Sequence, residues 1–339
     1  MCEIRYIHEI FLEEIKECID VLNIYILILK GVTMKISLRG NLQGLLSGMF
    51  WGLDTSLNSL ILLMVPFVVG DSKLLSSTLL LAFFHDFFSA IFLTIDLSIR
   101  GRFKNTIQIL KTRSAYFVMI AAVFAGPLGM RAYLFAVEKL GAGLTATISA
   151  IYPAVAALLG MIFLKDYLTR KGWFGLALTI LAVIFLGYSG FSQIEELFIG
   201  SLAALLCVIG WASESVITAY GMKEDILPKQ ALFIRQWTSS LVYLLFMIIE
   251  GDVVYSIATV FSSPSILFIV CLSVIGTLSY LFYYSAIDTI GPVRATGLNV
   301  TYSIWTVIFS LFLFGGQLDI KLIISSIVIV IGTLFVLKN

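Results

Sequence analysis

Charged residues are scarce in this sequence. Of its 339 residues only 13% are Asp, Glu, Lys or Arg, whereas 60% are hydrophobic, and the mean hydropathy is +1.02. A soluble globular domain has about 25% charged residues, so the composition excludes that class. The few charges cluster between long apolar runs, which is the pattern of a helical protein that crosses the membrane several times.

Several other features are also missing. The net charge of +1 gives no electrostatic basis for binding nucleic acid. The four cysteines have neither metal-ligand spacing nor the arrangement of a disulfide framework. His8 and His85 are the only histidines, so we expect no metal site and no cofactor. A phosphate-binding glycine loop, a nucleophile–base pair and a filter-like polar loop are absent too, which disfavours a membrane enzyme and a channel.

Residues 1–33 form a leader that differs from the rest. Acidic and apolar residues alternate there in an amphipathic pattern, and the apolar run from Val21 to Leu29 is too short to span a bilayer. No small-residue cleavage site precedes Met34, which argues against a signal peptide. Two interpretations stay open: an interfacial helix on the membrane, or translation that begins at Met34.

After the leader we predict ten transmembrane helices and no soluble domain. If Lys and Arg are assigned to alternating sides, fourteen fall on the side of the N-terminus and only Lys73, Lys139 and Lys321 fall on the other. The positive-inside rule therefore predicts that both termini are cytoplasmic. The predicted spans are 42–65, 74–99, 114–137, 142–164, 172–190, 197–220, 230–249, 264–287, 292–314 and 319–337.

The chain contains an internal repeat. A shift of 150 residues places similar residues on one another, and Trp51-Gly-Leu-Asp54 resembles Trp211-Ala-Ser-Glu214 at a different spacing. Two groups of five spans, 40–190 and 197–338, would then have opposite orientations, as in the inverted repeats of secondary transporters. The shift pairs Gly126 with Gly276, Ala136 with Ala286, Gly141 with Gly291, Ser149 with Asn299 and Tyr152 with Tyr302.

Carboxylates lie at matched places in these repeats. Glu214 is inside an apolar run, where a charge costs roughly 3 kcal/mol on insertion scales. Trp211, three residues earlier, lies on the same helical face, and an acid beside an aromatic ring suits a cationic ligand. Two interpretations remain for Glu214 and Asp54: a site for a cation or a coupling proton, or neutralisation by an intramembrane arginine, Arg131 or Arg235.

Other polar and aromatic residues also fall within the spans. His85-Asp86 is interpreted as a ligand contact or proton relay, or else as a hydrogen bond between helices. The pairs Tyr280–Tyr284, Tyr302–Trp305 and Asn299–Tyr302 each share a helical face. Their convergence would form an aromatic cage for a quaternary ammonium group, whereas ordinary packing is the alternative. Gly126-Pro127 predicts a kink in the third span.

Seven stretches of the sequence resemble the LicB-type choline permeases of Gram-positive bacteria, within the drug/metabolite transporter superfamily. The resemblance runs from about residue 40 to the end and leaves out the leader. Its stretches are 44–52 (GLLSGMFWG), 85–87 (HDF), 125–130 (AGPLGM), 149–153 (SAIYP), 211–215 (WASES), 234–236 (IRQ) and 295–307 (ATGLNVTYSIWTV).

This resemblance implies a ten-helix transporter of the bacterial cytoplasmic membrane that imports choline, a small cation, by proton-coupled symport. Asp54 and Arg131 depart from the family pattern, in which uncharged residues are expected. Either they pair with each other, or the ligand is betaine or a polyamine. Export of amphipathic cations or amino acids is a further alternative. By position the resemblance implies a substrate site of Trp51, His85, Trp211, Glu214, Tyr280, Asn299, Tyr302 and Trp305. Helical spacing adds Tyr284 to that site, because it shares a face with Tyr280. The charges within the spans add Asp54, Asp86, Arg131 and Arg235 as coupling or charge-pair candidates.

Overall fold

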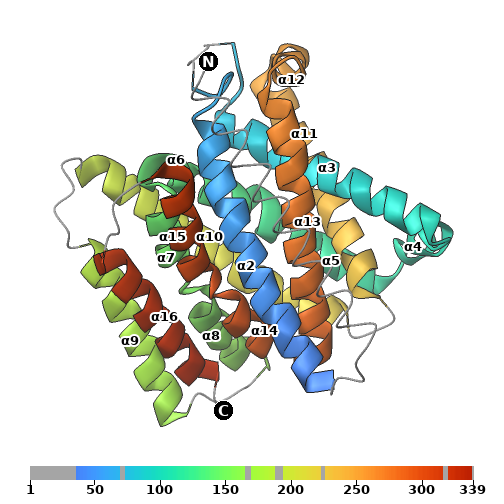
Figure 1. Cartoon of the computed structure of the whole chain (residues 1–339). Coiled ribbons are helices and arrows are strands. Elements are labelled where there is room, and N and C mark those ends of the chain that lie inside the picture. Colours follow the sequence, from blue (N-terminus) through green and yellow to red (C-terminus); the bar gives the residue numbers. More distant parts are fainter. Residues whose placement is uncertain are drawn as a thin grey trace.

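The computed structural model describes residues 36–68, 73–164, 169–187, 194–222, 226–315 and 320–337, and these ranges fold into helices and connecting turns without a strand (Figure 1). The leader and Met34 lie outside the described residues, so both interpretations of the leader stay predictions. The helical bounds are α2 (Ile36–Leu62), α3 (Ser77–Ile99), α4 (Phe103–Ile109), α5 (Arg113–Val123), η1 (Phe124–Met130), α6 (Arg131–Leu140), α7 (Ala142–Ser149), α8 (Tyr152–Leu164), α9 (Arg170–Gly187), α10 (Ile194–Gly221), α11 (Pro228–Glu250), α12 (Val253–Phe261), α13 (Ser265–Ile290), α14 (Pro292–Asn299), α15 (Tyr302–Phe314) and α16 (Ile320–Leu337).

The chain is a multi-pass membrane protein. Within the described ranges, seven helical stretches are long and apolar enough to cross a bilayer: Ser77–Ile99, Arg113–Leu140, Ala142–Leu159, Glu195–Gly221, Pro228–Glu250, Ser265–Ile290 and Pro292–Phe314. Each coincides with a predicted span. The other three predicted spans fall on α2, α9 and α16, of which α16 contains a shorter apolar stretch, Ile320–Phe335. The number of ten spans stays a prediction.

Helix ends recur at a spacing of 150 residues. α8 and α15 begin at Tyr152 and Tyr302, and α9 and α16 begin at Arg170 and Ile320. Gly141 and Gly291 both adopt positive φ, 78° and 83°, and each directly precedes a short helix that stops before a second one begins. The shift that relates the two halves of the sequence thus also relates two broken helices, α7–α8 and α14–α15.

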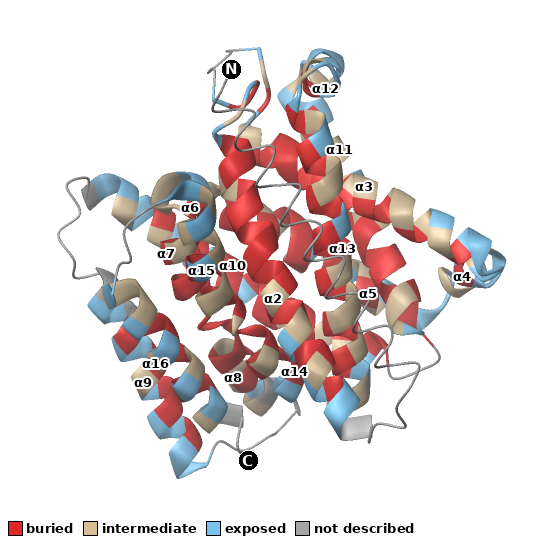
Figure 2. Cartoon of the chain, in the orientation of Figure 1, coloured by how far each residue is buried: buried red, intermediate tan, exposed pale blue. Residues whose placement is uncertain are grey.

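Helix α2 packs against α13, α14 and α15 through a row of glycines. Gly40, Gly44, Gly48 and Gly52 are spaced four residues apart, so they lie on one face of α2. A Cβ atom at Gly52 would lie within 2.8 Å of the backbone nitrogen of Thr306, so only glycine permits this approach. Small residues of this kind allow close helix packing in membranes. Buried residues fill the middle of the bundle around α2 and α13, whereas α4 and α9 at its edges are largely intermediate or exposed (Figure 2).

At Gly126-Pro127, where the sequence predicts a kink, the structure has a seven-residue π-helix, η1, between α5 and α6. Proline lacks the N–H for one helical hydrogen bond, so the ladder widens locally. At this widened segment α10 comes close: a Cβ at Gly210 would lie 2.9 Å from the Cα of Gly129. The indole of Trp211, the next residue of α10, lies beside Gly129 and is thereby directed into the bundle.

Candidate substrate site

A small cavity lies between α2, α8, α10, α13 and α14, where the broken helices meet the long ones. Its volume is about 30 Å³, which is room for about two water molecules. Aromatic rings dominate its wall, and Glu214 is the only ionisable carboxyl or basic group in it. The lining residues are Trp51, Tyr152, Trp211, Glu214, Ser279, Tyr280, Tyr283 and Asn299.

The rings contact one another at steep angles. The ring centroids of Trp51 and Trp211 are 5.3 Å apart with an interplanar angle of 80°, and those of Trp51 and Tyr280 are 5.1 Å apart at 71°. Tyr152 meets Trp211 edge to face at 5.9 Å. Edge-to-face contacts turn several ring faces in different directions, so the cavity is bounded by both faces and edges of aromatic rings.

Both indole N–H groups in this wall lack a hydrogen-bond partner among the described residues. The Nε1 atoms of Trp51 and Trp211 are buried and make no hydrogen bond within the part of the chain that the structure describes. A buried donor without a partner costs roughly 1–3 kcal/mol. A ligand hydroxyl or a water molecule in the cavity could accept from them and remove that cost.

Glu214 has two close neighbours on other helices. Its Oε1 atom accepts a hydrogen bond from the hydroxyl of Tyr284 at 2.8 Å and lies 3.6 Å from Nε of Arg235. The carboxyl side chain is 4% exposed and the arginine 0%. The sequence left open whether a cation, a proton or an arginine compensates Glu214, and Arg235 does so in part.

Arg235 is shared with a second acid. Its NH1 atom is 3.1 Å from Oδ1 of Asp86, its NH2 atom donates to the hydroxyl of Tyr280 at 2.7 Å, and its guanidinium carbon lies 4.2 Å from the centroid of the Tyr280 ring. NH1 also contacts the side-chain oxygen of Gln236. Because Asp86 competes for the same guanidinium, Arg235 does not neutralise Glu214 by itself.

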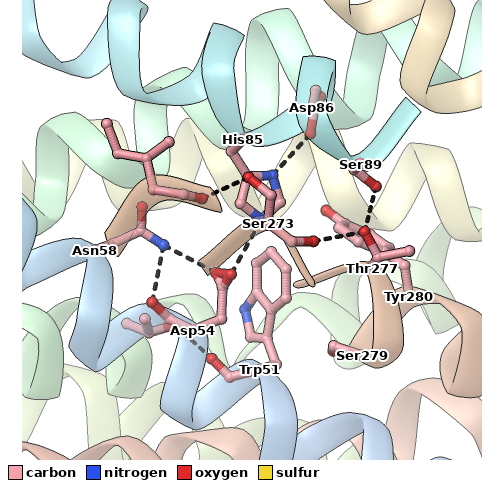
Figure 3. A network of polar contacts seen from close by, with 12 residues as sticks. Trp51, Asp54, Asn58, His85, Asp86, Ser89, Ser273, Thr277, Ser279 and Tyr280 are labelled. Atoms are coloured by element: carbon pink, nitrogen blue, oxygen red, sulfur yellow. Dashed lines mark hydrogen bonds and ion pairs between the residues drawn. The ribbon is translucent and has the colours of Figure 1, made fainter. Parts of the chain in front are cut away.

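His85 continues this chain of charges toward α2. Its Nδ1 atom is 3.0 Å from Asp86 Oδ1 and its Nε2 atom is 3.1 Å from Asp54 Oδ1. Asn58 donates to the other Asp54 oxygen at 2.9 Å. Figure 3 shows the imidazole between the two aspartates. A Cβ at Gly276 would collide with both His85 and Asp54, so glycine is required where α13 passes this pair.

The broken helices are joined by a reciprocal pair of hydrogen bonds. The hydroxyls of Ser149 and Tyr302 are 2.6 Å apart, and the hydroxyl of Tyr152 donates to Oδ1 of Asn299 at 2.8 Å. The 150-residue shift exchanges Ser149 with Asn299 and Tyr152 with Tyr302. Each bond is therefore the counterpart of the other under the 150-residue shift.

The residues singled out from the sequence fall into three groups. Trp51, Trp211, Glu214, Tyr280 and Asn299 line the cavity. Behind them, Tyr284 bonds to Glu214 and Tyr302 bonds to Ser149. The buried charge network consists of Asp54, His85, Asp86 and Arg235. Outside both lie Trp305, whose ring stacks on Phe309 at 6.0 Å, and Arg131.

The pairing of Asp54 with Arg131 is not found. NH2 of Arg131 is 3.0 Å from Oε1 of Glu250, and both side chains are about one-third exposed. Asp54 is fully buried and bonds to His85 instead. Asp54 is in α2 and Arg131 begins α6, and spacing along the chain could not show which partners the other helices bring to each of them.

Four residues of the site were not selected from the sequence. Tyr152, Ser279 and Tyr283 line the cavity, and the ring of Tyr133 packs on Trp211 at 4.8 Å. The repeat contained a signal for Tyr152, because it is the counterpart of Tyr302. Tyr283 is adjacent to Tyr284 in sequence, and helical spacing alone directs it to another face.

Among the described residues no group of three or more metal-binding side chains occurs.

Comparison with known proteins agrees with this architecture. The sequence pattern of the EamA-like transporter family matches residues 38–188 and, a second time, 198–338. Protein LicB of Haemophilus influenzae is 31% identical over 270 residues, which cover 80% of this chain and 87% of that protein. One crystal structure superposes with a TM-score of 0.58 over 88% of this chain and 95% of its own, at 18% identity; it shows a shared fold. The two family matches cover most of the chain, so it is a membrane transporter rather than an enzyme and belongs to the EamA-like transporter family.

Proposed function

We propose that this transporter imports choline, or a closely related quaternary ammonium compound, through the cavity around Glu214. The observation that carries the proposal is a single carboxylate set among indole and phenol rings, with Arg235 only partly compensating it. A trimethylammonium group cannot donate a hydrogen bond or lose its charge. It is therefore held by ring faces, at about 2 kcal/mol when desolvated, and by Coulomb attraction to a carboxylate.

The hydroxyl of choline also fits this wall. It can accept from the unpartnered Nε1 of Trp51 or Trp211, and it can donate to an oxygen of Glu214. Betaine carries a carboxylate in place of that hydroxyl, and this second negative charge would meet Glu214. Selection of choline over betaine is expected for that reason.

We infer transport by alternating access between two inverted five-helix repeats, 40–190 and 197–338. The recurrence of helix ends at 150 residues and the reciprocal hydrogen bonds between the broken helices support this. Discontinuous helices at a repeat interface are typical of transporter substrate sites near the midplane. A cavity of about 30 Å³ is too small for choline, so the two halves must move apart to admit it. We place both termini on the cytoplasmic side of the bacterial cytoplasmic membrane, as the charge distribution predicts.

The charges of the buried network support a proposal of coupling to a proton. With neutral His85, the three carboxylates and Arg235 carry a net charge of −2. One choline cation and one proton on His85 would together bring it to zero, and a neutral core is the form that can be buried at least cost. This arithmetic favours symport of choline with a proton. An exporter would instead have to exchange outgoing choline for an incoming proton.

Calorimetric binding to the purified protein tests the substrate. Choline should bind, while 3,3-dimethyl-1-butanol, its uncharged isostere, should bind at least about 30-fold more weakly because both the ring faces and Glu214 lose a cation. Equal affinity for the two compounds would rule out the carboxylate cage. Tighter binding of betaine or of a polyamine would assign the site to that ligand.

A further inference from the structure

A second and larger cavity lies on the outside of the helix bundle, where α4 and α5 meet α11. Its volume is about 330 Å³, within the range of about 300–1,000 Å³ that ligand pockets occupy. We call it the α4 groove. Its lining residues are Thr94, Phe103, Ile107, Leu110, Met119, Phe233, Ile234, Trp237, Thr238 and Leu241.

The wall of the α4 groove is almost entirely hydrocarbon. Phe103, Ile107 and Leu110 project from one face of the segment that contains α4. The indole N–H of Trp237 is already used, because it donates to Thr94 Oγ1 at 3.1 Å. Leu241, which lines the groove, is 60% exposed, so the groove is open to the surroundings of the bundle. An alkyl chain from the bilayer matches this shape and chemistry, whereas a polar solute would find few partners.

Specific contacts hold the groove in shape. Nε2 of Gln230, in the first turn of α11, donates to Asn105 Oδ1 at 2.9 Å and to Thr106 Oγ1 at 3.1 Å. The rings of Phe103 and Phe233 meet edge to face at 6.1 Å. These bonds fix α4 against α11, so the groove is a built feature of the fold.

The segment that supplies Phe103, Ile107 and Leu110 to the α4 groove is basic. Residues 100–113 contain five cations and no acid. Two of them are engaged, because Arg100 bonds to Asp96 and the guanidinium of Arg113 lies over the Phe117 ring. The remaining three, Arg102, Lys104 and Lys111, are exposed and make no ion pair within the described ranges. Arg102 and Lys104 flank Phe103, and Lys111 follows Leu110, so each is next to a lining residue in the chain.

We propose that the α4 groove binds an anionic phospholipid of the surrounding bilayer, with an acyl chain in the groove and its phosphate against Arg102, Lys104 and Lys111. Clusters of basic residues beside membrane helices attract lipids with anionic headgroups. Each Lys or Arg near the membrane surface enriches such a lipid about fivefold. A zwitterionic lipid carries its own ammonium group beside the phosphate, so the three cations attract it less.

The bound lipid would contact one face of α11 while the transport machinery uses the opposite face. Phe233, Ile234 and Trp237 line the groove, whereas Arg235 and Gln236 point into the buried charge network. A lipid in the groove therefore braces the helix that carries Arg235. The binding itself does not depend on which substrate the transporter carries.

Trp237 provides a reporter inside the groove. The protein is placed in nanodiscs of phosphatidylcholine that contain a small fraction of a lipid with brominated acyl chains, and fluorescence is compared with that of Trp237→Phe to isolate Trp237. Brominated phosphatidylglycerol should quench this component several-fold more than brominated phosphatidylcholine at equal fraction. The triple variant R102Q/K104Q/K111Q should lose the difference. The variant R170Q/K171Q, which removes two exposed cations of α9, should keep it.

Equal quenching of Trp237 by the two brominated lipids would overturn the proposal, as would a phosphatidylglycerol preference that survives the triple variant. Native mass spectrometry supplies a second measurement. A retained phosphatidylglycerol adduct is expected on the parent protein and on R170Q/K171Q, and its loss is expected on R102Q/K104Q/K111Q. An adduct that persists on the triple variant would also contradict the assignment.

Discussion

The hydroxyl of Tyr284 donates a hydrogen bond of 2.8 Å to Oε1 of Glu214. The bond fixes the carboxylate at the edge of the aromatic cavity and leaves its second oxygen for a ligand. Both residues are buried. A carboxylate held in this way can attract a cation strongly, because little water screens it.

Glu214→Gln should abolish most choline binding. The amide preserves the shape of the side chain and can still accept from Tyr284, but it removes the charge. Loss of one member of a buried charge pair costs about 2–5 kcal/mol, which is a loss of affinity of about 30-fold or more. Calorimetry measures it. Glu250→Gln is the matched control, since that acid is partly exposed and bonds to Arg131; affinity there should be unchanged.

The indole of Trp211 should contribute through its ring. Trp211→Leu keeps an apolar side chain without a π face and should weaken choline binding about 30-fold, from about 2 kcal/mol of lost cation–π attraction. Trp211→Phe should lose less choline affinity, because phenylalanine keeps an aromatic face. Trp305→Leu removes an indole outside the cavity, and an effect as large as that of Trp211→Leu would place the cage elsewhere.

Asp54→Asn should separate binding from coupling. Asp54 contacts His85 and does not line the cavity, so Asp54→Asn leaves every wall contact in place, and choline affinity should fall far less than in Glu214→Gln. Accumulation driven by a pH gradient should fall to the level of electrical driving alone, because His85 loses the partner that stabilises its protonated form. Full pH-driven accumulation in this variant would exclude the Asp54–His85 pair from coupling.

Gly276→Ala should destabilise the protein at the passage of α13 past α2 and α3. The added Cβ meets His85 and Asp54, which are fully buried and hydrogen-bonded. Overpacking of a tight core costs typically 1–3 kcal/mol, visible as a lower melting temperature in detergent. Gly143→Ala is the control, because its Cβ would meet mainly the mobile end of Leu322. Equal melting temperatures for the two variants would argue against the tight packing.

The helices of the fold could be predicted from the sequence because bilayer thickness imposes long apolar runs. The pairing of Trp211 with Glu214 followed from helical spacing, and both line one cavity. Contacts between distant helices could not be derived in this way. Asp54 binds His85 at a place where α13 has a glycine, Gly276, and Trp305 stacks on Phe309 where α15 packs on Gly52. These outcomes depend on three-dimensional packing, which periodicity within one helix does not encode.

Uptake of radiolabelled choline into proteoliposomes tests the central claim most directly. With an acidic exterior, the protein should give saturable accumulation that unlabelled choline inhibits, that a proton ionophore abolishes and that Glu214→Gln lacks. Uptake no greater than in protein-free liposomes, or equal uptake by Glu214→Gln, would contradict a choline importer built around Glu214.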